Sequence, residues 1–280
     1  MPTSISISMK ELQNLKEYIL KTGLKRAPPS NDYELLRIED GNISIIVYKS
    51  GKLVFNDSPE SKKLLSYVLE KEVEYDYILG TDEVGKGEWY GPLVVVCAAL
   101  TPSEMAKFRE MGVRDSKSIK LPILMHLAER IVKNKITWKP LMISPQTFNQ
   151  KFAEFKRENK TLNELLAWAH SAAIRDMLDL ITFRKAKVLI DKFDVEKTYR
   201  RLYGLDESRL TILQTSKETE VAVNVASILA KYVFEKEVDK LDNFYNIDLR
   251  KATPSKIDPQ ILPQVAKIHF KNVRAYAQLD

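Results

Sequence analysis

The sequence contains few of the residues that form covalent cross-links or soft metal centres, with one cysteine and three histidines among 280 residues. A single cysteine, Cys97, excludes an internal disulfide and a cluster of metal-binding thiolates, and we expect no disulfide-linked partner. The histidines, His126, His170 and His269, lack the spacing of a zinc site. Any bound metal ion would therefore have to be held by carboxylate oxygens.

Long apolar runs are also missing. No run is long enough to cross a bilayer, and residues 1–10 lack the charged-then-apolar order of a signal peptide. We therefore expect a cytoplasmic protein without a membrane partner. Hydrophobic residues make up 44% of the chain and charged residues 29%, which is typical of a globular protein with a substantial core. The net charge of +6 is consistent with a polyanionic partner, although many basic proteins bind no nucleic acid.

The spacing of apolar residues predicts a small α+β domain over residues 1–70. Apolar residues recur at helical spacing at both ends of this segment. Between these ends lie short runs typical of strands, which are separated by glycine turns. The expected helices cover residues 10–20 and 61–72, and the expected strands cover residues 33–38, 43–48 and 53–55. We place the boundary of this helix, three-strand, helix unit near Tyr75.

Residues 76–280 alternate between short strands and longer helical stretches. The strands start near Tyr77, Leu93, Ile136 and Lys187, and the helices cover residues 103–111, 122–132, 162–181 and 221–241. This order predicts an α/β domain with a mixed β-sheet that is flanked by helices. After two proline-containing breaks, the tail predicts a last helix from Leu262 to Ala277.

The stretch from Gly80 to Pro92 is the most informative part of the chain, because two adjacent carboxylates there run into a glycine-rich turn. Asp82 and Glu83 repel each other, and in a partly buried setting this repulsion raises a pKa unless a cation compensates for it. A divalent metal ion would do so. Neighbouring strand residues face opposite sides, so both carboxylates reach one ion only where the strand bends or ends. Otherwise Glu83 points elsewhere in the cleft or offers its backbone carbonyl.

Three further acidic residues occupy positions that are compatible with a metal site. Asp191 closes an apolar strand, at a place where mixed α/β sheets often present functional side chains, although a charged strand end is also ordinary. Glu218 and Glu220 precede a helical run, where a carboxylate also stabilises the helix N-terminus. His170 lies within apolar helical spacing, which favours a packing role for it.

The turn Gly85-Lys86-Gly87 offers backbone amides that no Cβ atom obstructs at the glycines. A sugar-phosphate chain could approach this turn closely, and the main chain could bind a 2′-hydroxyl group. The pattern alone is weak evidence for such a site.

Residues Thr81 to Gly91 resemble the N-terminal catalytic motif of type 2 ribonucleases H, and Leu189-Ile190-Asp191-Lys192-Phe193 is similar to a second motif of that group. The leader, which contains Tyr48 to Phe55, resembles the extra N-terminal domain of the ribonuclease HIII branch. The resemblance implies a ribonuclease H fold for the larger domain and a substrate-binding role for residues 1–70.

The resemblance also implies roles for individual residues. The catalytic and metal-binding acids would be Asp82, Glu83, Asp191 and Glu218, with Glu220 as an alternative to Glu218 because this segment departs from the family pattern by about one position. The substrate-binding residues would be Gly85, Lys86 and Gly87 in the turn, Ser116 and Lys117 in an Asp-Ser-Lys motif, and Lys49 and Lys52 in the leader. On sequence alone, the Asp-Ser-Lys motif is equally consistent with a capped turn.

The resemblance therefore implies an endoribonuclease that cleaves the RNA strand of an RNA-DNA hybrid and leaves 3′-hydroxyl and 5′-phosphate ends. Two Mg²⁺ ions per active site would serve as cofactors, with Mn²⁺ as an alternative. We expect a monomer. The competing interpretations are an enzyme like ribonuclease HII, which incises at single ribonucleotides in DNA, and a non-catalytic hybrid-binding protein.

Overall fold

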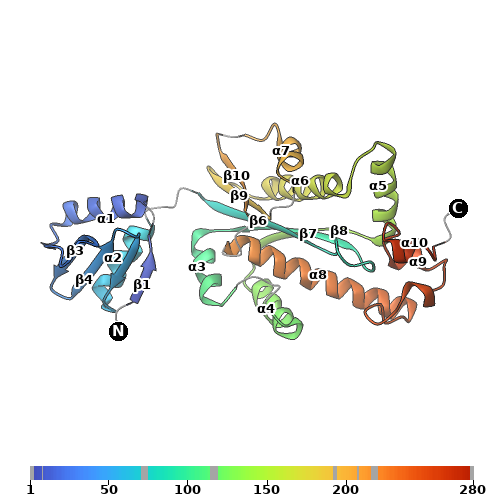
Figure 1. Ribbon diagram of the computed structural model, residues 1–280, viewed down its shortest axis with the longest axis horizontal. Helices are drawn as coiled ribbons and strands as arrows, with labels where there is room; N and C mark the ends of the chain where they lie inside the picture. The colour runs from blue at the N-terminus through green and yellow to red at the C-terminus, as the bar shows by residue number, and fades with distance from the viewer. Residues whose placement is uncertain are drawn as a thin grey trace. The chain divides into compact units, whose positions relative to one another are not determined.

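The computed structural model describes residues 3–7, 9–70, 75–113, 119–191, 194–206, 208–215 and 220–277. The chain divides into two compact units, Met1–Glu74 and Tyr75–Asp280 (Figure 1). Within the described ranges, no helix is both long enough and apolar enough to span a membrane.

The first unit is an antiparallel sheet of five strands with two helices. The strands are β1 (Thr3–Ser6), β2 (Arg26–Ala27), β3 (Glu34–Asp40), β4 (Ile43–Tyr48) and β5 (Lys52–Phe55), in the order β1-β5-β4-β3-β2. The helices are α1 (Met9–Thr22) and α2 (Pro59–Glu70). Sequence analysis expected three strands and missed β1 and β2, which are the short edge strands of the sheet.

A single apolar cluster holds this unit together. Alternate residues of β3 and β4, such as Leu36, Ile38 and Ile45, are buried with Leu15 of α1 and Leu64 of α2. This alternation leaves the intervening strand residues on the face that the helices do not cover. The uncovered face is therefore available for polar or charged contacts.

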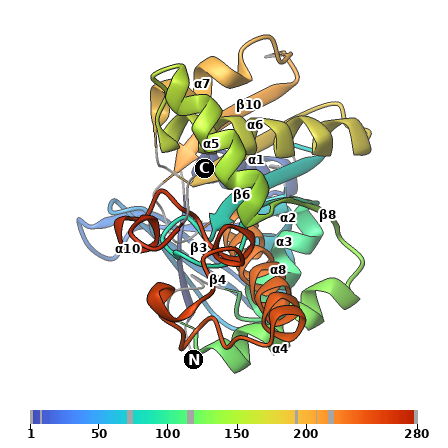
Figure 2. The ribbon, with the colours of Figure 1, turned by 90° about the vertical axis from the view of Figure 1, so that its right-hand side faces the viewer.

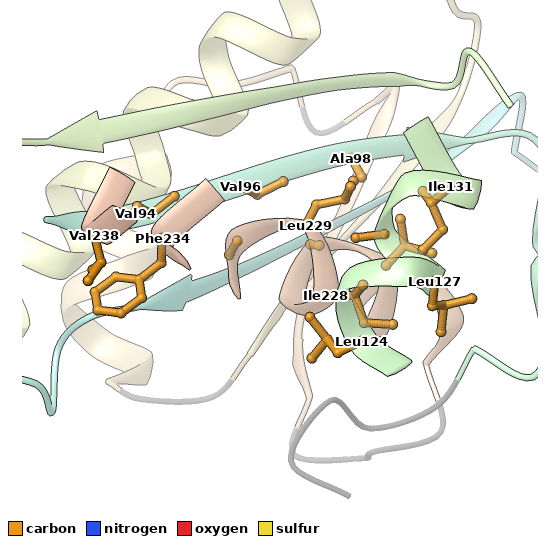
Figure 3. Packing of buried hydrophobic residues seen from close by; sticks show 14 of the residues in the cluster. Val94, Val96, Ala98, Leu124, Leu127, Ile131, Ile228, Leu229, Phe234 and Val238 are labelled. Atoms are coloured by element: carbon orange, nitrogen blue, oxygen red, sulfur yellow. The ribbon is translucent and has the colours of Figure 1, made fainter. Parts of the chain in front are cut away.

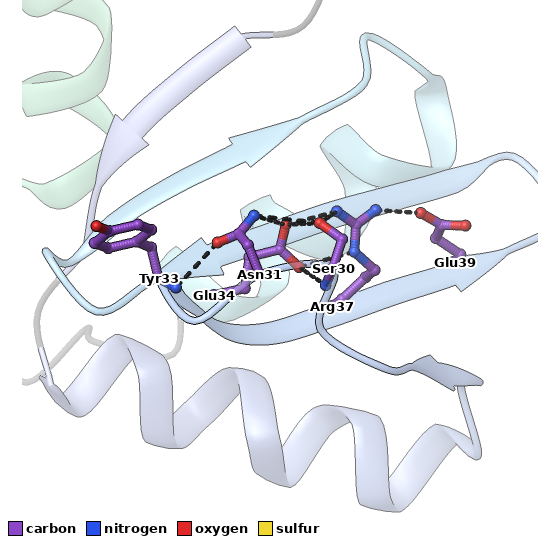
Figure 4. Close-up of polar contacts among 6 residues, drawn as sticks. All are labelled: Ser30, Asn31, Tyr33, Glu34, Arg37 and Glu39. Carbon is purple, nitrogen blue, oxygen red and sulfur yellow. Dashed lines mark hydrogen bonds and ion pairs between the residues drawn. The ribbon is translucent and has the colours of Figure 1, made fainter.

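A polar network fixes the segment that leads into β3 (Figure 4). The guanidinium group of Arg37 donates to Glu34 at 2.7 Å and to Glu39 at 2.6 Å, and the hydroxyl group of Ser30 donates to Glu34 at 2.7 Å. Hydrogen bonds from Arg37 and then Ser30 lower the pKa of Glu34 to about 2. The charge of Arg37 is therefore neutralised by Glu34 and Glu39, two acids of its own strand.

The second unit is built on a mixed sheet with the strand order β10-β9-β6-β7-β8. The strands are β6 (Tyr77–Val84), β7 (Leu93–Leu100), β8 (Thr137–Ile143), β9 (Ala186–Asp191) and β10 (Leu210–Thr215). Strands β6, β9 and β10 are parallel, while β7 pairs antiparallel with both β6 and β8. This arrangement confirms the predicted mixed α/β fold. The sequence analysis missed β10.

Helices cover both faces of this sheet. They are α3 (Pro102–Glu110), α4 (Leu121–Lys133), α5 (Pro145–Arg157), α6 (Leu162–Leu180), α7 (Val195–Leu202) and α8 (Val221–Tyr245), followed by a 3₁₀ turn (Pro254–Lys256), α9 (Leu262–Val265) and α10 (Lys271–Arg274). Figure 2 shows α6 and α7 on one side of the sheet and α4 and α8 on the other. The helices α5 and α7 are additions to the predicted set.

Strand β7 is buried along its whole length because the two helix layers enclose it. Val94, Val96 and Ala98 face α8 and α4 (Figure 3), whereas Val95 and Cys97 pack with α6. Cys97 is a free, fully buried thiol. The central strands are thereby fixed between two cores, which gives β6 a rigid position.

Strand β6 and helix α8 approach each other unusually closely at Gly80. A Cβ atom added to Gly80 would lie 2.1 Å from the carbonyl carbon of Ala222 and 2.4 Å from the amide nitrogen of Val223. Only glycine lets the first turn of α8 lie directly against the strand there. This contact sets the distance between the strand that carries Asp82 and the helix that covers it.

The predicted helix from Leu262 to Ala277 is wrong. In its place the chain forms α9 and α10, with a β-bridge between Tyr90 and Ala266 between them. The amide of Lys267 donates to the carbonyl of Trp89 at 2.7 Å, and the Lys267 side chain turns inward and is fully buried. These contacts with residues 89 and 90 replace the hydrogen bonds that a continuous helix would make.

Candidate active site

Asp82 lies near the end of β6 on the face that packs against α8. Its Oδ1 atom accepts a hydrogen bond from the backbone amide of Glu83 at 2.8 Å, and the Asp82 carboxylate also accepts one from the side chain of Ser227 on α8. Burial raises the pKa of Asp82 to about 7, and the charges of Glu83 and Asp191 act in the same direction. A carboxylate that is buried beside other carboxylates is the electrostatic setting that a bound cation would stabilise.

Glu83 points to the opposite face of β6, toward α6. Its Oε2 atom lies 3.0 Å from Nε2 of His170, and its Oε1 atom accepts from Nζ of Lys86 at 3.2 Å. Burial acts to raise the pKa of Glu83, but the contacts with His170 and Lys86 outweigh burial and lower it. The strand therefore separates its two acids, and the carboxylate of Glu83 contacts a histidine and a lysine.

His170 is a site residue that sequence analysis interpreted as a packing residue. Its ring is fully buried, with Nδ1 2.9 Å from the hydroxyl of Thr81 and Nε2 bound to Glu83. In the tautomer with its proton on Nε2, the ring donates to Glu83 and accepts from Thr81. Apolar helical spacing locates His170 on the buried face of α6, but no local signal reveals partners almost ninety positions earlier.

Asp191, the last residue of β9, lines the same cleft as Asp82 and Glu83. The cleft has a volume of about 530 Å³. Its lining also includes the predicted turn, Gly85 to Gly87, together with Ser227 and Lys231 of α8. The structure therefore brings together six residues that the sequence analysis had proposed for the site, namely Asp82, Glu83, Asp191 and the turn Gly85 to Gly87. Helix α8 contributes Ser227 and Lys231, which the sequence analysis had not proposed.

The remaining predicted residues do not belong to this described group. Glu218, Ser116 and Lys117 lie outside the described residues. Glu220 is the N-cap residue of α8, makes no side-chain capping hydrogen bond, and does not line the described part of the cleft. Lys49 and Lys52 are exposed at the β4-β5 hairpin of the first unit. The choice between Glu218 and Glu220 therefore remains a prediction.

The glycine turn is held in place by residues distant in sequence. Gly85 has a φ of +96°, and a Cβ atom there would lie 2.1 Å from the carbonyl oxygen of Pro92, so only glycine fits. The buried ammonium of Lys267 donates to the carbonyls of Glu88, Tyr90 and Gly91 at 3.0, 2.9 and 2.7 Å. Burial lowers the pKa of Lys267 to about 7, against the opposing charge of Glu88. Residues 88–91, directly after the turn, are thereby fixed.

The donor chemistry of the cleft fits a hard divalent cation. Carboxylate oxygens are the ligands that Mg²⁺ and Mn²⁺ prefer. Burial and then the charges of Glu83 and Asp191 raise the pKa of Asp82, and a cation would offset the repulsion by these charges. Over the described ranges, no three Asp, Glu, His or Cys side chains form a complete metal-binding group. Among the described acids of the cleft, Glu83 contacts His170, and Asp82 and Asp191 both line the cleft.

Comparison with known proteins identifies the class to which this fold and cleft belong. A family model described as Ribonuclease HII matches residues 79–273. The chain belongs to the ribonuclease HII family, and is therefore a metal-dependent ribonuclease.

Within this class, the relatives that the chain matches along most of its length are named ribonuclease HIII. It is 25% identical to ribonuclease HIII of Chlamydia pneumoniae, with 96% of each chain covered. It is 29% identical to ribonuclease HIII of Streptococcus thermophilus, with 89% of this chain and 90% of the relative covered. The crystal structure of Bst-RNase HIII in complex with Mn²⁺ superimposes with a TM-score of 0.61 at 21% identity, covering 99% of this chain and 98% of the other.

Proposed function

We propose that this protein is a ribonuclease HIII-type endoribonuclease that hydrolyses the RNA strand of RNA-DNA hybrids. The observation that carries the proposal is the convergence of Asp82, Glu83 and Asp191 on one cleft that is also lined by the glycine turn. The chain matches the ribonuclease HIII relatives over almost their whole length, including the leader. This match supports ribonuclease HIII as the branch of the family.

Two Mg²⁺ ions, or Mn²⁺ in their place, would be held by Asp82 and Asp191 as central ligands. Glu218 would complete the set, with Glu220 as its alternative. Bound ions of this kind generate a nucleophile from water near neutral pH and neutralise charge on the leaving oxygen. Attack of water on phosphorus with cleavage of the bond to the ribose 3′-oxygen would give the 3′-hydroxyl and 5′-phosphate ends that we propose as products.

The chain's own residues bind and orient the substrate. The amides of Gly85 and Gly87 would approach the RNA strand and contact its 2′-hydroxyl groups, which distinguish RNA from DNA. Lys86 would contact a phosphate, and Ser116 and Lys117 would contribute further phosphate contacts. The hydrogen bonds from His170 and Lys86 hold the Glu83 carboxylate at the edge of the cleft, where it orients water or a metal ligand.

A cleavage assay on three substrates tests the proposal. The protein with Mg²⁺ should cut a uniform RNA-DNA hybrid, leave double-stranded RNA intact, and cut a DNA duplex with one embedded ribonucleotide much more slowly. Preference for the single ribonucleotide would show a ribonuclease HII-type specificity, which the description of the family model makes the principal alternative. Hybrid binding without magnesium-dependent products at catalytic protein concentrations would show a non-catalytic protein.

His170 should act as a positioning residue for Glu83. We expect His170→Leu to reduce kcat by roughly 10-fold to 100-fold and to raise the metal concentration needed for half-maximal rate, the usual cost of losing a group that orients a metal-binding carboxylate. Steady-state assays over a Mg²⁺ titration measure both effects, and His170→Gln, which retains a donor, should recover part of the loss. A lower melting temperature with unchanged metal dependence would assign only packing to His170.

The leader should contribute binding energy and not chemistry. We propose that Lys49 and Lys52, both exposed, contact phosphates of the hybrid. Replacing both with glutamine should raise the Michaelis constant by roughly 10-fold at low salt and leave kcat unchanged, because each lost phosphate contact removes counterion release. The matched control is the pair Lys62→Gln and Lys63→Gln on α2, which should leave the Michaelis constant unchanged. Equal effects of the two pairs would contradict a specific role for the hairpin.

We also propose that the protein acts as a monomer in the cytoplasm. The cleft and the glycine turn are built from residues of one chain, so the proposed chemistry needs no second subunit. Sedimentation of the protein at assay concentration tests the oligomeric state.

A further inference from the structure

The wall of the cleft formed by α8 carries a lysine that neither the sequence motifs nor the proposed mechanism uses. Lys231 lies four positions after Ser227, so the two side chains share one face of the helix. Ser227 hydrogen-bonds Asp82, and Lys231 lines the same cleft as Asp82 and Asp191. Lys231 therefore belongs to the wall of the cleft that contains the acidic pair.

The position of Lys231 is fixed by two contacts on its own helix. Its Nζ atom lies 2.8 Å from Oε1 of Glu235 and 5.0 Å from the ring centroid of Phe234. The Lys231 side chain nevertheless keeps 29% of its surface exposed. It is therefore held near the cleft and remains accessible from it.

Glu235 does not depend on Lys231 alone. Its side chain is only 7% exposed, and Arg250 donates to its Oε2 atom through Nε at 3.0 Å and through a second guanidinium nitrogen. Burial acts to raise the pKa of Glu235, but hydrogen bonds from Lys231 and Arg250 outweigh burial and lower it. Arg250 would continue to neutralise Glu235 if the Lys231 ammonium turned toward another anion.

We propose that Lys231 binds a phosphate group of the nucleic-acid substrate, an inference that rests on the proposed function. A polyanion entering a cleft that contains several carboxylates requires cations on the cleft walls. Lys86 is such a cation on the β6 side, where it forms an ion pair with Glu83. Lys231 is such a cation on the α8 side, where it forms an ion pair with Glu235. In both cases a carboxylate pairs with the ammonium group of a lysine that lines the cleft and keeps part of its side chain exposed.

The salt dependence of binding separates this role from a purely structural one. A lysine that contacts phosphate releases about one counterion, so its loss reduces the slope of log K against log salt by about 0.9. A lysine that only neutralises Glu235 leaves this slope unchanged and alters stability instead.

The experiment measures binding of a fluorescent RNA-DNA hybrid to the full chain at several salt concentrations. An Asp82→Asn background in the presence of Mg²⁺ prevents cleavage during the measurement. Lys231→Gln should weaken binding by roughly 5-fold to 10-fold near 0.1 M salt and reduce the slope by about 0.9. The matched control is Lys236→Gln, an exposed lysine of the same helix that lies over Tyr232 outside the cleft lining, and it should keep the original slope.

A second variant keeps the test decisive if Lys231→Gln folds poorly. The double variant Lys231→Gln with Glu235→Gln removes the buried acid together with its partner, and it should show the same reduced slope. An unchanged slope in either folded variant overturns the inference. Cleavage of the hybrid by the wild-type protein is measured in parallel, so failure of the proposed function is distinguished from failure of the role of Lys231.

Discussion

Asp82→Asn is expected to lower kcat on an RNA-DNA hybrid by about three orders of magnitude or more while preserving the fold. Asp82 is buried beside the carboxylates of Glu83 and Asp191, and burial, followed by these charges, raises its pKa to about 7. Metal ions supply several kcal/mol of transition-state stabilisation, and each 1.36 kcal/mol changes a rate tenfold. Single-turnover cleavage with saturating Mg²⁺ measures the loss, and hybrid binding should remain.

The control for this variant is Asp176→Asn. Asp176 is an exposed acid on α6 that pairs with Lys139 at 2.8 Å, away from the described lining of the cleft, so its replacement should leave activity unchanged. Wild-type turnover by Asp82→Asn would show that the metal site is elsewhere.

The stability of the metal-free protein gives an independent readout of Asp82. Its folded pKa lies above the ordinary value of 3.8, so the folded state binds more protons than the unfolded state between these values. This contribution to stability is present in acid, falls as the pH rises toward about 7, and stays absent above it. Asp82→Asn should therefore raise the melting temperature at pH 8 without metal.

Gly80→Ala is expected to destabilise the second unit by about 3 kcal/mol or more, at the upper end of what overpacking costs. The new methyl group would meet the backbone of Ala222 and Val223 at 2.1 to 2.4 Å, and a backbone segment cannot give way as a flexible side chain can. Relief requires moving α8 away from β6, which also carries Ser227 away from Asp82. Activity should therefore fall together with stability.

Denaturant unfolding of Gly80→Ala against Gly87→Ala isolates this contact. No atom lies within 4 Å of a Cβ atom added to Gly87, so that variant should stay within about 0.5 kcal/mol of the wild type in stability. Equal stability of the two variants would contradict the close approach of α8 and β6.

The parts of the structure that sequence analysis predicted are those governed by local patterns. Strand β7 is a continuous apolar run, and α6 and α8 have long apolar helical spacing, so their types follow from the residues themselves. The strand-turn-strand around Asp82 was predicted for the same reason, because β-branched runs on both sides are separated by glycines. Alternation along the strand left two alternatives open for Asp82 and Glu83, and the structure has the one in which Glu83 points away from Asp82, toward His170.

The features that sequence analysis missed depend on contacts between distant residues. His170 has the local pattern of a packing residue, and its role follows only from the approach of α6 to β6. Local spacing likewise predicted one C-terminal helix, whereas contacts of Lys267 and Ala266 with residues 89 and 90 divide it. Tertiary hydrogen bonds of this kind can outweigh local helix propensity, because a buried polar group without a hydrogen-bond partner costs free energy.

The anchoring of residues 88–91 by Lys267 affects how the protein is made. The lysine lies 176 to 179 positions after the carbonyls that it binds. A chain emerging from the ribosome therefore exposes the glycine turn long before the residue that fixes its far side has been translated. Until Lys267 has been translated, the carbonyls of Glu88, Tyr90 and Gly91 lack this donor, so residues 88–91 reach their final conformation only in a chain that extends at least to Lys267.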